Sequence, residues 1–109
     1  MIIYEDDNVI VKPSTIEGFG LFAKREFKKG EVVLVWHPTI LTKEKLNNMP
    51  EDQKRYINIL ENGTSVLMNV PERYVNSSDK PNIHTVGTTD VAVRDIKINE
   101  EITSNYTLH

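Results

Sequence analysis

The chain has 109 residues, of which 39% are hydrophobic and 27% charged, a composition typical of one folded domain. It has no cysteine, which excludes disulfides and thiolate zinc sites, and its formal net charge of -3 argues against direct binding to nucleic acid. The three histidines, His37, His84 and His109, are too far apart in sequence to form a metal-ligand motif, so we expect no metal site.

The sequence gives no indication of a membrane or of secretion. No apolar run approaches the length that spans a bilayer, and the opening IIYEDD is too short and too acidic for a signal peptide. We therefore expect a cytoplasmic protein, or one inside the host cell if the protein is viral. No linker is visible, so we expect residues 1–109 to form a single domain.

Short strands dominate the first third of the chain. Residues 2–4 and 9–11 read as strands joined by the acidic turn EDDN, and LFAKREF reads as the next strand and its exit. The β-branched run EVVLVWH, which follows Gly30, predicts another strand.

The middle of the chain, about residues 38–70, has the features of a helical insertion. Thr42 can cap a short helix over KEKLNN, and Pro50 suits the first position of a second one. Tyr56, Ile59 and Leu60 then recur at helical spacing, and the helix is expected to end at Gly63. After it, short apolar pieces predict strands again: SVLM, RYV, DVAV and EIT.

Two segments of the chain resemble each other. Residues 23–33 read AKREFKKGEVV, and residues 92–102 read AVRDIKINEEI. Each predicts a strand end, a tight turn and a strand start, with Gly30 or Asn99 at the position that needs positive φ. Similar turns can arise by chance, but the pattern also fits two similar hairpin-like units on either side of the intervening residues.

Three stretches could carry chemistry, and each has an ordinary structural explanation. EGFGLF places Gly18 and Gly20 on either side of Phe19, which indicates a turn or bulge, or else a loop where a ligand can press against exposed main chain. YVNSSDKPN reads as a turn, although the amide of Asn76 offers a donor and an acceptor to a ligand. Tyr106 near the C-terminus either packs or presents its hydroxyl.

The order of these stretches resembles the SET domain of protein lysine methyltransferases, particularly the small stand-alone microbial and viral ones. The resemblance runs over residues 8–106, through Gly-x-Gly, AKREFKKGE, an insertion, RYVNSSDKPN and AVRDIKINEEITSNY. Ser77 stands where the family usually has histidine, and Asn99 stands where it usually has glycine.

The resemblance implies a mainly β fold, the SET domain β-clip, with a knot-like C-terminal core and a short helical insertion. It implies S-adenosyl-L-methionine as the cofactor and a lysine side chain of a protein or peptide as the methyl acceptor. Carried over by position, the cofactor contacts fall on the following residues: Gly18, Phe19, Gly20, Arg73, Asn76 and Ser77. Tyr106 takes the place of the active-site tyrosine.

The residue types suit methyl transfer, in which the protein mainly positions two reactants and keeps the amine neutral. The family often closes its lysine channel with a further C-terminal segment, whereas here only three residues follow Tyr106. The channel is then open, closed by residues 38–70, or closed by a second subunit in a homodimer. The alternative function is a non-catalytic SET-like module that binds the cofactor or a basic peptide.

Overall fold

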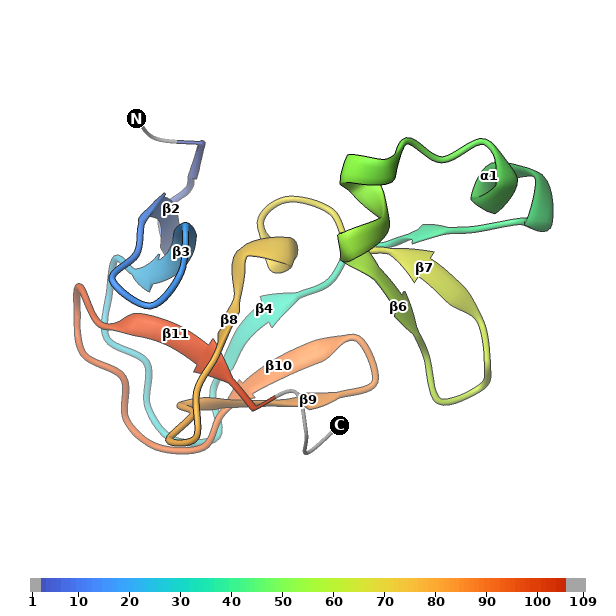
Figure 1. The fold of residues 1–109 in the computed structure, drawn as a ribbon. Helices are drawn as coiled ribbons and strands as arrows, with labels where there is room; N and C mark the ends of the chain where they lie inside the picture. The colour runs from blue at the N-terminus through green and yellow to red at the C-terminus, as the bar shows by residue number, and fades with distance from the viewer. Residues whose placement is uncertain (1–2, 106–109) are drawn as a thin grey trace.

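Strands form most of the computed structural model, which describes residues 3–105 (Figure 1). The largest sheet joins the N-terminal strands to the last strand of the chain. Its strand order is β1 (Tyr4–Glu5), β2 (Val9–Pro13), β3 (Phe19–Ala23), β11 (Glu101–Ser104) and β8 (Asn76–Ser77). All neighbours are antiparallel except β11 and β8, which run parallel.

A second sheet has three antiparallel strands in the order β4 (Val32–Val35), β10 (Thr89–Ala92) and β9 (Ile83–Val86). The apolar core lies between these two sheets, and its largest fully buried side chains include Phe27, Leu21 and Ile96. Alternation produces this core: in β2, Val9 and Val11 are buried while the residues between and after them are more exposed.

The insertion forms a separate lobe that projects to one side (Figure 1). It contains a third sheet of order β5 (Thr39–Ile40), β7 (Ser65–Leu67) and β6 (Ile57–Ile59), the helix α1 (Lys43–Asn47) and the 3-10 helix η1 (Glu51–Tyr56). The cap predicted for α1 is confirmed, since Thr42 Oγ1 accepts a hydrogen bond from the Lys45 N–H at 3.2 Å.

Polar side chains attach this lobe to the sheets. The N–H of His37 donates to Oε2 of the buried Glu72 at 2.7 Å, and the carbonyl of His37 accepts from Asn69 Nδ2 at 2.6 Å. His37 lies where the chain enters the insertion, and the segment that leaves the insertion thus binds both its N–H and its carbonyl group. Glu72 belongs to the 3-10 helix η2 (Glu72–Tyr74).

The two similar segments pair with each other. Phe27 and Ile96 form an antiparallel bridge through N–H···O bonds of 2.9 and 2.8 Å. The Gly30 N–H donates to the Ala92 carbonyl at 2.8 Å, and the Asn99 N–H donates to the Ala23 carbonyl at the same distance. Because equivalent residues exchange equivalent bonds, the segments are related by an approximate two-fold axis through the bridge, and the sequence repeat is structural.

The repeat extends to the charged side chains of these turns. Arg25 pairs with Glu31 at 2.7 Å, and Arg94 pairs with Glu100 at 2.8 Å. The hydrogen bonds from Arg25 and from the Lys28 N–H lower the pKa of Glu31. Partial burial alone would raise the pKa of Glu100, but hydrogen bonds from the Lys97 N–H, Arg94 and Asn82 outweigh it and leave this pKa lowered. Both carboxylates therefore stabilise the fold above their unfolded pKa, and this contribution is lost as the pH falls through the folded value.

Two predicted elements are wrong. The helix expected up to Gly63 stops at Tyr56, and residues 57–59 form strand β6, because they pair with β7 across a turn at Gly63 (φ 86°). The stretch RYV is not a strand: it forms most of η2, in which the Arg73 N–H bonds to the Asn69 carbonyl and the Tyr74 N–H to that of Pro71. Strands β5 and β9 were not predicted from the sequence at all.

Within residues 3–105, no helix is long and apolar enough to span a membrane.

The pseudo-symmetric turns make a prediction about stability. Gly30 has φ 90° and Asn99 has φ 72°, and a Cβ added at Gly30 would meet no atom within 4 Å. We expect Gly30→Ala to lower the free energy of unfolding by about 1–2 kcal/mol through backbone strain alone. Gly30→Asn should cost less, because it copies the residue at the equivalent turn. Urea unfolding measures both, and equal stability of Gly30→Ala and the wild type would contradict the argument.

Candidate active site

The C-terminal strand is held in place by a buried asparagine. Asn82 is 1% exposed, its Oδ1 accepts from the Thr103 N–H at 2.9 Å, and its Nδ2 donates to the Glu101 carbonyl at 2.8 Å. The Asn82 N–H also donates to the Thr103 carbonyl at 3.1 Å. The segment around β8 therefore lies against β11, as expected for the knot-like core.

The side chain of Asn76 is half-buried, and its amide nitrogen is bonded within the protein. Its Nδ2 is 2.9 Å from Glu101 Oε2 and 3.1 Å from the carbonyl oxygens of both Glu17 and Phe19. Ser14 Oγ lies 3.3 Å from the same nitrogen and donates to Glu101 Oε1 at 2.7 Å. Because an amide nitrogen carries two hydrogens, these acceptors occupy it fully, and only Oδ1 is left to meet a ligand.

Gly20 is required by the carboxylate of Glu101. A Cβ added at Gly20 would overlap Glu101 Oε2 and lie 2.9 Å from its Cδ. Gly18 differs, since it has φ 46° and a Cβ there would meet open space. Of the two predicted glycines, Gly18 thus presents open main chain, while Gly20 makes room for a side chain of the same domain.

A row of aromatic rings extends from the segment that contains Gly18 and Gly20 to the insertion. Phe19 packs edge-on against Tyr74 with ring centroids 6.3 Å apart, and Tyr74 packs against Tyr56 at 6.5 Å. The guanidinium carbon of Arg73 lies 4.1 Å from the centre of the Tyr56 ring. Arg73 Nε donates to the Met68 carbonyl at 2.9 Å, and Nη2 donates to Gln53 Oε1 at 3.2 Å. Arg73 thus fastens the insertion to the segment that carries Asn76.

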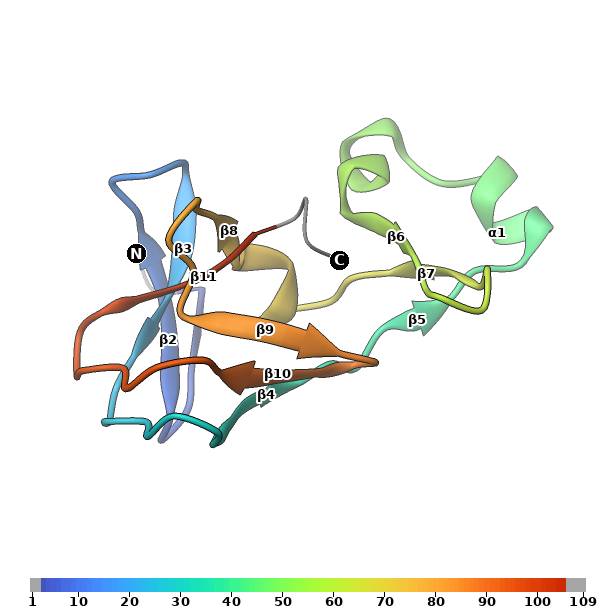
Figure 2. The same ribbon diagram turned by 90° about the horizontal axis from the view of Figure 1, so that it is seen from below.

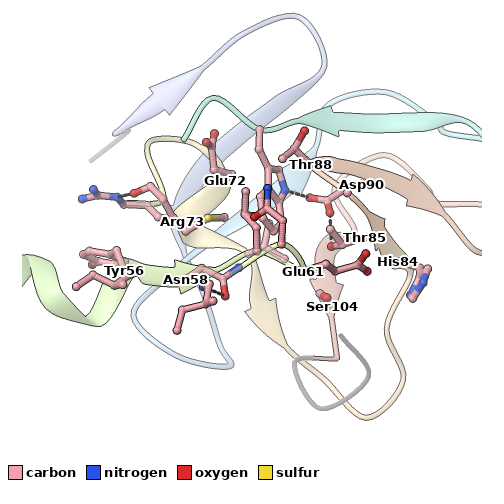
Figure 3. A pocket seen from close by; sticks show the side chains of 18 of the residues that line it. Tyr56, Asn58, Glu61, Glu72, Arg73, His84, Thr85, Thr88, Asp90 and Ser104 are labelled. Atoms are coloured by element: carbon pink, nitrogen blue, oxygen red, sulfur yellow. Dashed lines mark hydrogen bonds between the residues drawn. The ribbon is translucent and has the colours of Figure 1, made fainter. Parts of the chain in front are cut away.

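An open cavity of about 820 Å³ lies next to Tyr56, the last of these rings (Figure 3). One wall is the insertion, from Arg55 to Asn62, and the other is the β9–β10 hairpin with Trp36 and Ser104. Strands β6 and β9 are both edge strands of their sheets, so the cavity lies between two sheet edges. Figure 3 shows Tyr56 and Arg73 toward one side, with His84, Thr85 and Asp90 toward the other.

The far end of the cavity contains a buried carboxylate. Asp90 is 2% exposed, its Oδ2 accepts from Trp36 Nε1 at 2.9 Å, and its Oδ1 accepts from Thr85 Oγ1 at 2.6 Å (Figure 3). Asp90 faces Leu34 across the β4–β10 pairing, and this position lets the indole of Trp36 reach it from the end of β4.

The structure gathers most of the predicted cofactor residues in one region. Phe19 lies within hydrogen-bond distance of Asn76, and Ser77 follows on β8, opposite Ser104 in the parallel pairing. Arg73 lines the cavity. The predicted catalytic residue, Tyr106, lies outside the described residues. Cofactor contacts of the six residues stay predictions.

Sequence reasoning missed four residues that build this region: Ser14, Trp36, Asp90 and Glu101. Ser14 and Glu101 are 87 residues apart and Trp36 and Asp90 are 54 apart, so no local pattern connects them. The only available signal was the acidic Asp90 within the strand run DVAV, where an apolar residue is the usual occupant of a buried position.

Comparison with known protein families identifies the fold. The family model of the SET domain matches residues 18–107, most of the chain. The chain belongs to the SET domain family. The strands and the C-terminal core agree with the mainly β fold that the sequence resemblance implied. A comparison with curated proteins finds no match.

Solved structures support the same fold. A Plasmodium falciparum protein named as a histone methyltransferase aligns with a TM-score of 0.70 and 21% identity, over 94% of this chain and 95% of that one. Polycomb Repressive Complex 2 from Chaetomium thermophilum, bound to S-adenosylmethionine in an autoinhibited conformation, aligns with a TM-score of 0.72 and 25% identity, over 91% of this chain. The present chain spans only 15% of that chain.

In the part of the chain that the structure describes, no group of three or more acidic or histidine side chains could hold a metal ion.

The contact between Gly20 and Glu101 predicts a strong coupling. Gly20→Ala should lower the free energy of unfolding by about 1–3 kcal/mol, because the new methyl group displaces the carboxylate from Ser14 and Asn76. In a Glu101→Ala background the same change should cost less, since the nearest obstacle is gone and only Ser14 Cβ, 3.0 Å from the added Cβ, remains. Chemical unfolding of the single and double variants measures the coupling, and additive effects would refute it.

Proposed function

We propose that this SET domain transfers a methyl group from S-adenosyl-L-methionine to a lysine side chain of a protein or peptide. The observation that carries the proposal is the position of the cavity. Arg73, one of the predicted cofactor residues, lines it, and so do Val75, which precedes Asn76, and Ser104, which pairs with Ser77. A structural relative bound to S-adenosylmethionine supports the choice of cofactor.

The residues present fit this cofactor in size and charge. A volume of about 820 Å³ is in the range of small-molecule sites. Arg73 lines this cavity, and its guanidinium suits a carboxylate; outside the lining, the main chain at Gly18 is open and Asn76 Oδ1 can accept from an ammonium group. When bound, the cofactor supplies a methyl group that its sulfonium has already activated.

The protein itself has three tasks in this reaction. It positions the amine in line with the methyl group, keeps water away, and favours the neutral form of an amine whose unperturbed pKa is about 10.4. Apolar surroundings lower that pKa, and we assign the orientation of the amine to the hydroxyl of Tyr106. The charges of Arg55 and Arg73 lie on the cavity wall and likewise disfavour a second cation near them.

The shape of the cavity supports an extended peptide segment as the substrate. An extended chain lying between β6 and β9 would face two strands at the edges of their sheets, and edge strands can bind main chain without regard to sequence. A Polycomb structure of this fold is described in complex with H3K27me3 and H3K27M. We propose that the insertion, or a second subunit in a homodimer, contributes to closing the lysine channel.

Cofactor binding is the first test. The wild type should bind S-adenosylmethionine or its demethylated product in a calorimeter, whereas Asn76→Ala should weaken binding by about 1–3 kcal/mol because it leaves polar partners unsatisfied. Part of this loss comes from the loop that Asn76 holds, so thermal unfolding of the variant is measured in parallel. An absence of binding to the wild type would overturn the proposed function.

The second test separates the enzyme from a non-catalytic module. Tyr106→Phe should leave folding and cofactor binding nearly intact but lower transfer of label from S-adenosylmethionine to basic proteins by roughly 100-fold, because small errors in reactant placement are costly. Equal transfer by both proteins would remove Tyr106 from the mechanism. Cofactor binding without transfer by either protein would favour the module.

A further inference from the structure

The Asp90 end of the cavity is electrostatically unlike the Arg73 end. Glu61 lines the same side as Asp90 (Figure 3), while the guanidinium carbons of Arg55 and Arg73 lie 5.5 and 4.1 Å from the centre of the Tyr56 ring. Glu72 also lines the cavity, but it is buried and accepts from the His37 N–H, so the exposed charges are those of Arg55 at one end and Glu61 at the other. Of these charged residues, only Arg73 was predicted from the sequence, as a cofactor contact.

Trp36 joins the carboxylate of Asp90 to the cavity surface. Its indole is half-buried and lines the cavity, and its Nε1–H donates to Asp90 Oδ2 at 2.9 Å. Both oxygens of Asp90 accept hydrogen bonds, one from the indole and one from the hydroxyl of Thr85. Donation from the indole to a carboxylate polarises the ring and makes its face more negative. Tryptophan already gives the strongest cation–π interaction among side chains, so this ring is suited to a cation.

The cation that suits this end differs from the target amine. The target must lose its proton to react, and a nearby carboxylate opposes that loss by stabilising the ammonium form. A guanidinium keeps its charge at all relevant pH values and stacks on aromatic rings. The Trp36–Asp90 pair thus favours a permanently charged neighbour of the target lysine.

We propose that Trp36 and Asp90 form a specificity subsite for an arginine that flanks the target lysine in the substrate. The inference rests on the proposed function, because it assigns this end of the cavity to the substrate peptide. In it, the guanidinium stacks on the face of Trp36, Asp90 supplies the compensating charge through the indole, and Thr85 holds the carboxylate in position.

Trp36 is the one tryptophan in the sequence, so its fluorescence reports directly on this subsite. The probes are acetylated and amidated Gly/Ser nonapeptides with a central lysine and an arginine on each flank, and the same peptides with citrulline in place of arginine. Citrulline keeps the size and planarity of the side chain but carries no charge. We expect the arginine peptide to quench Trp36 saturably and to bind at least tenfold more tightly than the citrulline peptide.

Two variants and one control locate the effect, with anisotropy of fluorescein-labelled peptides as the common measurement. Asp90→Asn keeps an acceptor for Nε1 and removes the charge, so the preference for arginine should fall below about threefold. Trp36→Phe keeps Asp90 but removes the indole, and it should also reduce the preference. Glu44→Gln removes one exposed negative charge from α1 and should leave the preference unchanged.

The outcomes distinguish this subsite from a purely structural role. Equal affinity of the wild type for the two peptides would overturn the inference, as would an arginine preference that persists in Asp90→Asn. If Asp90→Asn fails to fold, Trp36→Phe decides in the same way. These titrations contain no cofactor, so a chain that prefers arginine without binding S-adenosylmethionine would refute the proposed function alone. Methyl transfer without an arginine preference would refute only the subsite.

Discussion

The buried side chain of Asn82 determines the course of β11, and the candidate active site depends on it. It satisfies the main chain of Thr103 and Glu101 from within the core. With β11 fixed, one of its sides pairs with β3 and the other with β8. The loop before β3 and the polar segment of β8, far apart in sequence, thereby become neighbours. A buried amide without these partners would cost about 1–3 kcal/mol, so this one residue links stability to the geometry of the site.

Local rules predicted the parts of the fold in which neighbouring residues interact. The Thr42 cap and the positive φ of Asn99 follow from single side chains and their immediate backbone. The predicted helix through Leu60 failed because its spacing fitted a helix while residues 57–59 found a better partner in β7. Strand pairing depends on segments elsewhere in the chain, which a local pattern does not contain.

The same difference between local interactions, which the sequence predicts, and contacts between distant segments, which it does not, is seen at the candidate site. The sequence identified Gly18, Phe19, Gly20 and Asn76 through their order along the chain, and the structure gathers them in one region. It did not reveal that Gly20 accommodates Glu101, or that the Nδ2 of Asn76 is occupied within the protein. Residues that a family motif marks as cofactor contacts here also hold the loop together. A loss of cofactor binding after mutation of Asn76 or Gly20 therefore has two components, one structural and one chemical.

The distribution of charge in the cavity follows from the demands of methyl transfer. The reacting amine must be neutral, yet the substrate side chains that recruit a protein partner are most effective when charged. A single site cannot satisfy both conditions, because any carboxylate that attracts the cation also holds its proton. In the arrangement that we propose, the two conditions are met at different places. Arg55 and Arg73 near Tyr56 would favour the neutral amine and an anionic group of the cofactor, and Asp90 behind Trp36 would attract a cation that never has to lose its charge. Since Arg73 anchors the insertion and Trp36 marks its entry, the distance between the two ends is set by how the insertion is attached to the sheets.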